Sequence, residues 1–433
     1  MRIAVVNWSQ RKVGGVETYL GNVIPEMHRL GLTLAFWSEV DVPIDRERIG
    51  LPEGVPAWCA SRLGTREALA ALREWHPDLL YVHKVMRPSV EAKLLDIAPA
   101  VFFAHDYYGT CISGAKTFKR PHVTPCNRRF GWQCLLHYYP HRCGGLSPLT
   151  MLRLYRLQSK RLELLHRYEA VVTHSEHLRL EYVRNGLAPE RVYDLLYYAH
   201  GAGESQSTFE LPHETDASSA AAEKAAGATR EQKSYSHLLF VGRMDFLKGG
   251  RAFLDALPQV SNALGRPLRV TFAGDGPDRR ALERQAALAR TRNENLAIEF
   301  TGWVDAARLN SLWDNCDLLV VPSLWPEPFG LVGVEAGLHN VPAAAFSVGG
   351  IPAWLVDGVN GYLAPGDPPT PAGLAAAIVR CLEDPATHER LRHNALKVAR
   401  RFSINAHLMA LLKIFEKILD NGSSATQRNG GAR

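Results

Sequence analysis

Two glutamates eight positions apart mark the part of this 433-residue chain best suited to chemistry. Glu327 lies in a loop rich in proline and glycine, and Glu335 lies in the helix expected after it. Between them, the backbone N–H groups of Phe329, Gly330 and Leu331 are expected to be free, because the first turn of a helix has no internal acceptors. Such a place suits an anion that carries hydroxyl groups on both sides. A nucleotide-sugar, with its diphosphate between a hexose and a ribose, has this chemistry.

Two cations follow the strand expected at residues 237–242. Arg243 comes directly after Gly242, and Lys248 precedes two further glycines. Arginine offers a planar pair of donors to phosphate oxygens and lysine a compact charge. Together they would stabilise the charge that grows on a departing diphosphate. The alternative interpretation is a pair of solvated surface cations.

Glycine-rich turns follow three other expected strands. Gly14 and Gly15 would let the backbone approach a phosphate in front of a helix, although they are not the G-x-G-x-x-G fingerprint. Gly274 and Gly276 in one turn, and Trp303 after another, would lie against a nucleobase and ribose. Each turn taken singly is also typical of a plain connection between strand and helix.

His105 ends the strand expected at residues 101–105. An imidazole there could bond a sugar hydroxyl or polarise the reacting centre. A structural histidine with partners of its own is an equally good interpretation.

Four of the seven cysteines follow one another with the spacing C-x14-C-x7-C-x8-C: Cys111, Cys126, Cys134 and Cys143. The C-x2-C pairs typical of zinc knuckles do not occur in the sequence. An odd number of cysteines in a chain without a recognisable export signal does not favour disulfides. Unligated thiols or a redox pair are the favoured interpretation, and a structural zinc site is the alternative.

The net charge of +6 is unevenly distributed. Residues 107–168 hold 11 basic residues against one acid, Glu163, and such an excess predicts an anionic partner. A helix expected at residues 151–168 repeats basic residues on one side: Arg153, Arg156, Lys160 and Arg167. This pattern suits an anionic membrane surface, and an ordinary half-buried helix is the alternative. No apolar run is long enough for a spanning helix.

Short apolar runs alternate with helical patterns in both halves of the chain, which predicts parallel sheets with crossover helices. We expect two doubly wound, Rossmann-like α/β domains that face a central cleft. The expected parts are an acceptor domain at residues 1–200, a flexible linker at 201–235, a nucleotide-sugar domain at 236–403, a helix at 404–420 that packs back toward the first domain, and a disordered tail at 421–433.

The motifs, in this order, resemble those of the retaining glycosyltransferases of family 4, which have the GT-B architecture. The likeness covers residues 1–200 and 236–420 and is most specific at residues 325–365, with Glu-Pro-Phe-Gly-Leu-Val-Gly-Val-Glu-Ala, then Gly-Gly-Ile-Pro and Val-Asn-Gly-Tyr-Leu-Ala-Pro. The resemblance implies that Glu335 bonds the ribose and Glu327 the donor sugar. It implies that Arg243 and Lys248 hold the diphosphate, and that no catalytic metal or other cofactor is required.

The leading hypothesis is a cytoplasmic, retaining glycosyltransferase that moves a sugar from a nucleoside diphosphate to an acceptor hydroxyl. The acceptor expected is a lipid-linked saccharide or polysaccharide precursor, with the protein peripheral on the inner face of the plasma membrane and without a nucleic-acid partner. Two alternatives keep the fold: a nucleotide-sugar epimerase or hydrolase, and a non-catalytic subunit that binds nucleotide-sugars.

Overall fold

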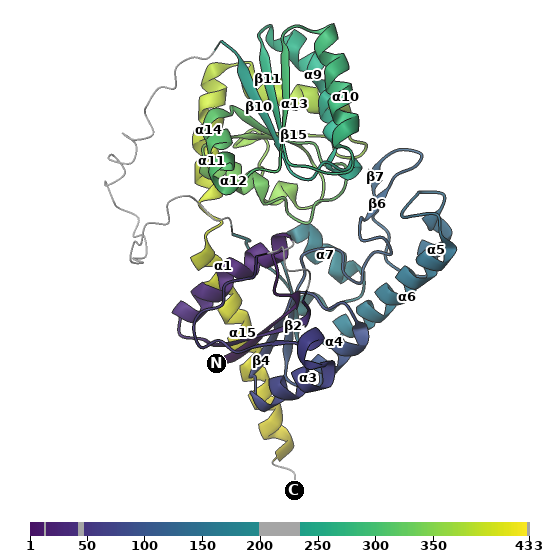
Figure 1. Cartoon of the computed structure of the whole chain (residues 1–433), viewed down its shortest axis with the longest axis vertical. Coiled ribbons are helices and arrows are strands. Elements are labelled where there is room, and N and C mark those ends of the chain that lie inside the picture. Colours follow the sequence, from purple (N-terminus) through teal and green to yellow (C-terminus); the bar gives the residue numbers. More distant parts are fainter. Residues whose placement is uncertain (13, 42–46, 199–233, 431–433) are drawn as a thin grey trace, which may run out of the picture.

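The computed structural model of the protein describes residues 1–12, 14–41, 47–198 and 234–430, with side chains as far as Asn421. It contains two α/β domains stacked along the long axis of the molecule (Figure 1). The last long helix runs from the second domain back along the first.

The first domain is built on a seven-stranded parallel sheet. Its order is β3-β2-β1-β4-β5-β8-β9, which begins as in a Rossmann fold. Successive residues of a strand point to opposite faces, so Ile3 and Val5 enter one core and Ala4 and Val6 another. The strands are β1 (Arg2–Ser9), β2 (Thr33–Val40), β3 (Ala57–Cys59), β4 (Leu79–Val82), β5 (Ala100–Phe103), β8 (Ala170–Thr173) and β9 (Val192–Asp194).

Helices cover both faces of this sheet: α1 (Gly15–Arg29), α2 (Ala60–Leu63), α3 (Thr65–Glu74), α4 (Pro88–Leu94), α6 (Pro148–Leu165), α7 (Glu176–Arg184) and the short η1 (Pro189–Arg191). Residues 104–147, between β5 and α6, form what we call the cysteine segment. It contains a two-stranded antiparallel ribbon and one short helix: β6 (Thr117–Phe118), β7 (Thr124–Pro125) and α5 (Gln133–Tyr138).

The second domain has a six-stranded parallel sheet in the order β12-β11-β10-β13-β14-β15, the strand order of a complete Rossmann fold. Its strands are β10 (Ser236–Val241), β11 (Leu268–Ala273), β12 (Leu296–Gly302), β13 (Leu318–Val321), β14 (Ala343–Phe346) and β15 (Gly361–Ala364). Its helices are η3 (Phe246–Lys248), α9 (Gly250–Leu264), α10 (Arg279–Arg292), α11 (Ala306–Asn315), α12 (Val332–Leu338), η4 (Ile351–Ala353), α13 (Pro371–Leu382) and α14 (Pro385–Ala399).

The final helix, α15 (Ile404–Gly430), lies against the first domain. Its Phe415 ring meets the edge of Tyr81 at 5.2 Å, and His407 bonds the hydroxyl of Tyr19. The tail from residue 421, which was expected to be disordered, continues this helix as far as Gly430. Asn421 and Gly422 are typical of a helix end, but a helix that has already formed extends at little cost per residue.

The predicted fold class is confirmed, because the sheet of each domain is parallel and has the strand order of a doubly wound α/β fold. Two edge strands, β3 and β9, were not predicted. The expected linker lies largely outside the described residues, which resume at Ser234. In the part of the chain that the structure describes, no helix combines the length and apolar character needed to cross a bilayer.

Candidate functional site

The loop of residues 322–331 connects β13 to α12 and lies where the two domains touch. The hydroxyl of Ser175 donates to the carbonyl of Pro328 at 2.6 Å, and that of Tyr107 donates to Pro326 at 2.6 Å. On the other side, Gly350 donates its N–H to the carbonyl of Glu327 at 2.6 Å. A Cβ on Gly350 would come within 2.2 Å of the Pro328 carbonyl, so glycine is required there. Both domains thus fix this loop.

Lys248 and Glu327 form an ion pair at the switch point of the second sheet, between β10 and β13. Open parallel sheets bind their ligands at such a point, beyond the carboxyl ends of the strands. Lys248 Nζ donates to Glu327 Oε1 at 2.6 Å, and Ser323 Oγ donates to the same oxygen at 2.6 Å. Glu327 is buried, and its Oε2 accepts no hydrogen bond from the described residues. One carboxylate oxygen is held by the protein and the other is left for a ligand.

Glu335 is on α12, one helical turn beyond the loop. Burial raises the pKa of its carboxyl above the usual range. Within the described residues its carboxylate accepts no hydrogen bond and forms no ion pair. A half-buried acid without donors of its own suits a ligand that supplies them, such as a vicinal diol.

Three successive amides between these acids are also unoccupied. In the described structure, the N–H groups of Phe329, Gly330 and Leu331 donate to no protein acceptor. The carbonyl of Phe329 is used, because Trp354 Nε1 donates to it at 2.7 Å. Gly330 has φ of +90°, a conformation that favours glycine. The site therefore presents a row of donors flanked by two carboxylates.

Arg243 is placed differently from Lys248. Its guanidinium pairs with Asp245 at 2.7 Å, and its side chain is 74% exposed. Asp245 also caps η3 by accepting from the N–H groups of Leu247 and Lys248. The structure thus brings Lys248, but not the Arg243 guanidinium, into contact with Glu327.

The glycines of the second domain have structural reasons of their own. A Cβ on Gly274 would come within 2.1 Å of the Gly242 carbonyl, and one on Gly276 within 2.4 Å of Met244. These turns pack backbone against backbone, whereas nothing lies near a Cβ built on Gly242. Trp303 is 86% exposed at the end of β12, so no packing inside the protein explains it.

The turn at Gly14 and Gly15 precedes α1, and both residues are exposed. Glu17 folds back to accept from the Gly14 N–H at 2.9 Å, and also from Asn7 and Trp8. The Gly14 amide predicted to meet a phosphate is therefore already bonded within the protein. Apart from its chain neighbours and its own helix, no described residue has an atom within 4 Å of a Cβ built on Gly15, which leaves room for a ligand.

His105 belongs to a group of four histidines, the others being His83, His174 and His407. His83 Nδ1 and His105 Nε2 are 2.9 Å apart, and the His105 and His174 rings are 6.2 Å apart. Burial, reinforced by His83, holds the pKa of His105 well below its usual value. The pKa of His83 falls to about 3 and those of His174 and His407 to about 4, chiefly through burial. The His174 ring contacts Phe329 at 5.8 Å, which links this neutral group to the loop.

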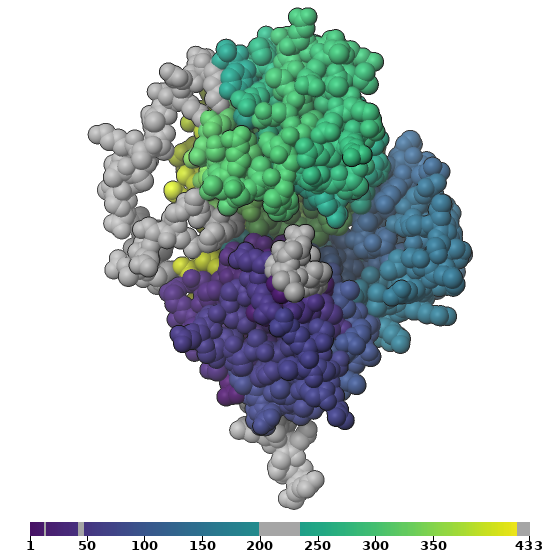
Figure 2. Space-filling model, viewed as in Figure 1, coloured from purple at the N-terminus to yellow at the C-terminus, as the bar shows by residue number. Residues whose placement is uncertain are grey.

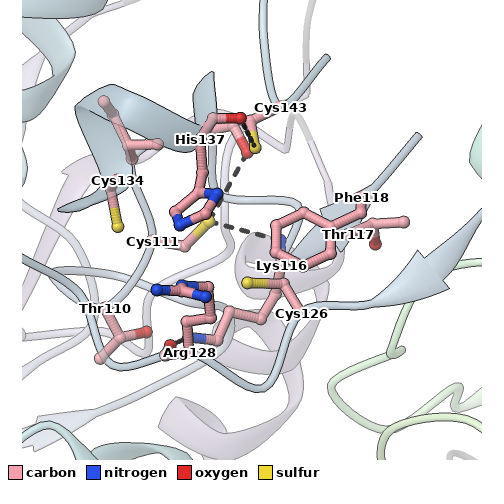
Figure 3. A pocket seen from close by; sticks show the side chains of 12 residues that line it. Thr110, Cys111, Lys116, Thr117, Phe118, Cys126, Arg128, Cys134, His137 and Cys143 are labelled. Carbon is pink, nitrogen blue, oxygen red and sulfur yellow. Dashed lines mark hydrogen bonds between the residues drawn. The ribbon is translucent and has the colours of Figure 1, made fainter. Parts of the chain in front are cut away.

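The four cysteines of the cysteine segment line one small cavity (Figure 3). All are free thiols, and burial raises the pKa of Cys126, of Cys134 and, to about 12, of Cys143. Among the described residues, no group of three or more His, Cys, Asp or Glu side chains is already arranged to hold a metal ion. Figure 2 shows the blue and teal lobe that contains these cysteines at one side of the molecule.

Several residues of the site were not predicted: Glu17, His83, Ser323 and Asp245. Glu17 lies three residues after Gly14 and accepts from its N–H, as the glutamate of a capping box does, but glycine lacks the side chain that gives this motif its sequence signature. Ser323 lies one helical turn before Glu327 but in a loop, where spacing does not indicate contact.

The second domain matches a family model described as "Glycosyl transferases group 1" over residues 235–384. These residues include Arg243, Lys248, Glu327 and Glu335. Residues 235–384 thus resemble a group 1 glycosyltransferase domain. The predicted resemblance to glycosyltransferases is confirmed over these residues, whereas the retaining mechanism remains a prediction.

Curated relatives of this group 1 domain cover only part of the chain. A glycogen synthase of Mycobacterium tuberculosis is 35% identical over 165 residues, which are 38% of each chain. A phosphatidyl-myo-inositol mannosyltransferase of the same species is 29% identical over 49% of this chain and 55% of its own. An uncharacterized glycosyltransferase of Methanocaldococcus jannaschii is 29% identical over 59% and 61%. The chain thus spans between about two fifths and three fifths of these relatives.

Solved structures match the group 1 domain and the first domain together. Anabaena HepE, crystallised with UDP and glucose, superposes with a TM-score of 0.61 at 19% identity, over 96% of this chain and 100% of its own. WaaG, a glycosyltransferase involved in lipopolysaccharide biosynthesis, has a TM-score of 0.60 at 16% identity, over 95% and 99%. At this identity the likeness concerns the fold, which is GT-B.

Proposed function

We propose that this protein is a retaining glycosyltransferase that moves a sugar from a nucleoside diphosphate to an acceptor hydroxyl. The observation that carries the proposal is the arrangement around the 322–331 loop. A buried, lysine-paired Glu327, a donor-free Glu335 and three unoccupied amides lie together at the switch point of the second sheet. The group 1 match over this region and the UDP-bound structure of Anabaena HepE support the choice of ligand.

In the proposed complex, the carboxylates contact hydroxyl groups of the donor and the cations contact its phosphates. Glu335 accepts from the ribose hydroxyls, and Glu327 Oε2 accepts from the donor sugar. Lys248 and the loop amides bond the diphosphate, because Lys248 contacts Glu327 and the free N–H donors lie in the chain between the two acids. Arg243 reaches the same phosphates by exchanging its exposed partner Asp245 for the ligand. Trp303 and the turns at Gly242 and Gly274 would border the nucleoside.

The proposed reaction keeps the configuration of the anomeric carbon. The bond from that carbon to the diphosphate oxygen breaks, and the acceptor oxygen bonds to the same carbon. The acceptor proton passes to the departing phosphate. Lys248 and the loop amides stabilise the charge on the leaving group, so we propose that the step needs no divalent cation. His105, kept neutral by its surroundings, bonds the transferred sugar.

We further propose that residues 1–200 bind the acceptor and that it is presented at an anionic membrane. Exposed residues recur every three or four positions along α6: Leu149, Leu152, Arg153, Arg156 and Lys160. Trp132, Leu136 and Leu146 nearby are more than 60% exposed. Apolar side chains bordered by basic ones suit the interface of an anionic bilayer, where a lipid-linked saccharide would be anchored. The mannosyltransferase relative acts, by its name, on a phosphatidyl-inositol.

Product analysis tests the reaction. The protein is incubated with a panel of UDP-, GDP-, ADP- and TDP-sugars, with and without lipid-linked saccharide acceptors. Transfer requires that donor is consumed chiefly when acceptor is present and that the new linkage retains the anomeric configuration. Consumption of donor alone, to an isomer or to free sugar, would favour the epimerase or hydrolase. Binding without turnover on any acceptor would favour the non-catalytic subunit.

Vesicle sedimentation tests the membrane proposal. Arg153, Arg156 and Lys160 are changed together to alanine, with Arg284, Arg290 and Arg292 of α10 as an equally charged control set. Each basic residue at an anionic surface contributes about 1 kcal/mol, so the α6 triple variant should bind anionic vesicles about 100-fold more weakly. The membrane proposal would be wrong if both triple variants lost vesicle binding equally, or if neither variant lost it.

A further inference from the structure

The cysteine segment has little apolar core of its own. Its separate core cluster contains three buried residues: Ile112, Phe130 and Tyr138. Its two strands have two residues each and its helix six. Small units of this kind do not bury enough apolar surface to be stable alone, and they commonly depend on disulfides or a bound metal. All four cysteines here are free thiols.

The four thiols come from four separate places along this segment and line one cavity. Cys111 follows β5, Cys126 follows β7, Cys134 is on α5, and Cys143 comes after that helix. The cavity has a volume of about 20 Å³. That volume is close to what a single water molecule or ion requires. Figure 3 shows the four side chains arranged around this space together with His137.

Two basic residues line the cavity, and a backbone N–H already donates to one of the cysteine sulfurs. Lys116 and Arg128 line it. The backbone N–H of Lys116 donates to Cys111 Sγ at 3.4 Å. The Lys116 ammonium is fixed by a buried ion pair with Glu181 at 2.6 Å. Four thiolates around a divalent cation carry a net charge of −2, which cations and N–H donors at this range would stabilise.

We propose that Cys111, Cys126, Cys134 and Cys143 bind one divalent zinc-like ion, and that this ion fixes the cysteine segment to the first domain. Each thiol would lose its proton to solvent when it ligates the ion, giving a closed tetrahedral Cys₄ site. The sulfurs surround the cavity without yet standing at ligand distance. Rotation of a cysteine side chain between staggered positions moves its sulfur by about 3 Å, enough to close a set of ligands around one ion.

Such a site would be structural. The same segment supplies Tyr107, whose hydroxyl bonds the 322–331 loop, and it leads into α6. A bound ion would therefore hold in place both a contact to the candidate site and the helix proposed to meet the membrane. Ion binding at this site would be independent of the proposed reaction.

The test is metal analysis combined with thiol mapping on the full-length protein purified without chelators. We expect about one zinc per chain by elemental analysis. Alkylation followed by peptide mass spectrometry should leave Cys111, Cys126, Cys134 and Cys143 unmodified until a chelator is added. Cys59, which is partly exposed outside the cavity, should react before and after and serves as the internal control.

Variants make the assignment specific. Cys126→Ser and Cys143→Ser should each lower the zinc content several-fold, whereas Cys59→Ser should leave it unchanged. When Zn²⁺ is added back to wild-type protein that a chelator has stripped of metal, the four cysteines should again be protected from alkylation. This arm uses no variant, so it remains valid even if a variant folds poorly. No metal before or after Zn²⁺ addition, a disulfide among these cysteines, or iron with bound sulfide would each overturn the proposal.

Discussion

Two ion pairs lie at the carboxyl end of β10, and they have nearly the same length. Lys248 and Glu327 are 2.6 Å apart with side chains 30% and 6% exposed, and Ser323 donates to the same carboxylate oxygen. Arg243 and Asp245 are 2.7 Å apart, with the arginine 74% exposed. Distance alone does not distinguish them, but burial does.

Burial determines what each pair can do. Water screens an exposed pair, so it contributes little to stability and can exchange its partner for a ligand. A pair that is largely removed from water cannot lose one member without leaving the other uncompensated. Lys248 is therefore a fixed part of the proposed site, and Arg243 is a cation that can move to a phosphate. Glu335 extends the comparison as an acid that has no cation partner among the described residues.

The largest effect is expected from Lys248→Ala. It removes the charge proposed to stabilise the leaving diphosphate, and the transfer rate should fall about 1,000-fold. It also leaves Glu327 buried without its cation, so the free energy of unfolding should fall by about 3 kcal/mol. Steady-state kinetics and denaturant titration measure the two effects.

Lys93→Ala, which removes an exposed lysine of α4, is the control and should change neither quantity. The double variant Lys248→Met with Glu327→Gln should recover part of the stability but none of the activity. Full activity in Lys248→Ala would remove the lysine from the site.

An intermediate effect is expected from Glu335→Gln, with opposite signs for binding and stability. Loss of the charged acceptor should weaken nucleotide-sugar binding about 50-fold. Burial raises the pKa of Glu335, so the folded protein binds this proton more tightly than the unfolded chain, and ionisation costs stability as the pH rises through that pKa. Glutamine removes this cost, and Tm at pH 7 should rise by about 2 °C.

The pH dependence gives a second check on Glu335. Donor affinity of the wild type should decline as the pH falls toward the raised pKa, because the protonated acid accepts ribose hydroxyls poorly. The Glu335→Gln variant should lack this decline, and Glu294→Ala, in an exposed turn, should behave as wild type. A destabilised Glu335→Gln protein would mean that the carboxylate has a partner within the fold.

The smallest effect is expected from Arg243→Ala. The free energy of unfolding should change by less than about 0.5 kcal/mol, because the ion pair with Asp245 is exposed. KM for the donor should rise about fivefold, and the difference from wild type should shrink at high salt. Arg269→Ala, which breaks another exposed pair, with Glu299, is the matched control and should leave KM unchanged. A loss as large as that of Lys248→Ala would erase the distinction between the two pairs.

Much of the fold could be predicted because parallel strands buried on both faces are continuous apolar runs, as in β5 and β13. The edge strands β3 and β9 have three residues each, too few to show a periodicity. The contact of α15 with the first domain includes a bond between His407 and Tyr19, 388 positions apart. Local sequence patterns carry no information about such a pair.

The proximity of Lys248 and Glu327 could be predicted because each follows the carboxyl end of a strand, and their roles in binding remain predictions. It could not be predicted from the sequence that a neighbouring side chain already occupies a group that was expected to bind the ligand. Glu17 takes the Gly14 amide, and Asp245 takes the Arg243 guanidinium. Gly274 and Gly276 have no room for a Cβ, so their glycines alone do not indicate a ligand. Sequence spacing does not define side-chain geometry, and it is this geometry that determines which groups are free to bind a ligand.

Thermal denaturation with the panel of nucleoside diphosphate sugars is the sharpest test of the proposed nucleotide-sugar site, because a ligand that binds only the folded protein raises Tm. At least one donor should raise the Tm of the wild type, and Glu335→Gln, itself folded and slightly more stable, should lose most of this rise. If no donor stabilises the wild type, or if Glu335→Gln responds equally, the 322–335 region is not the nucleotide-sugar site.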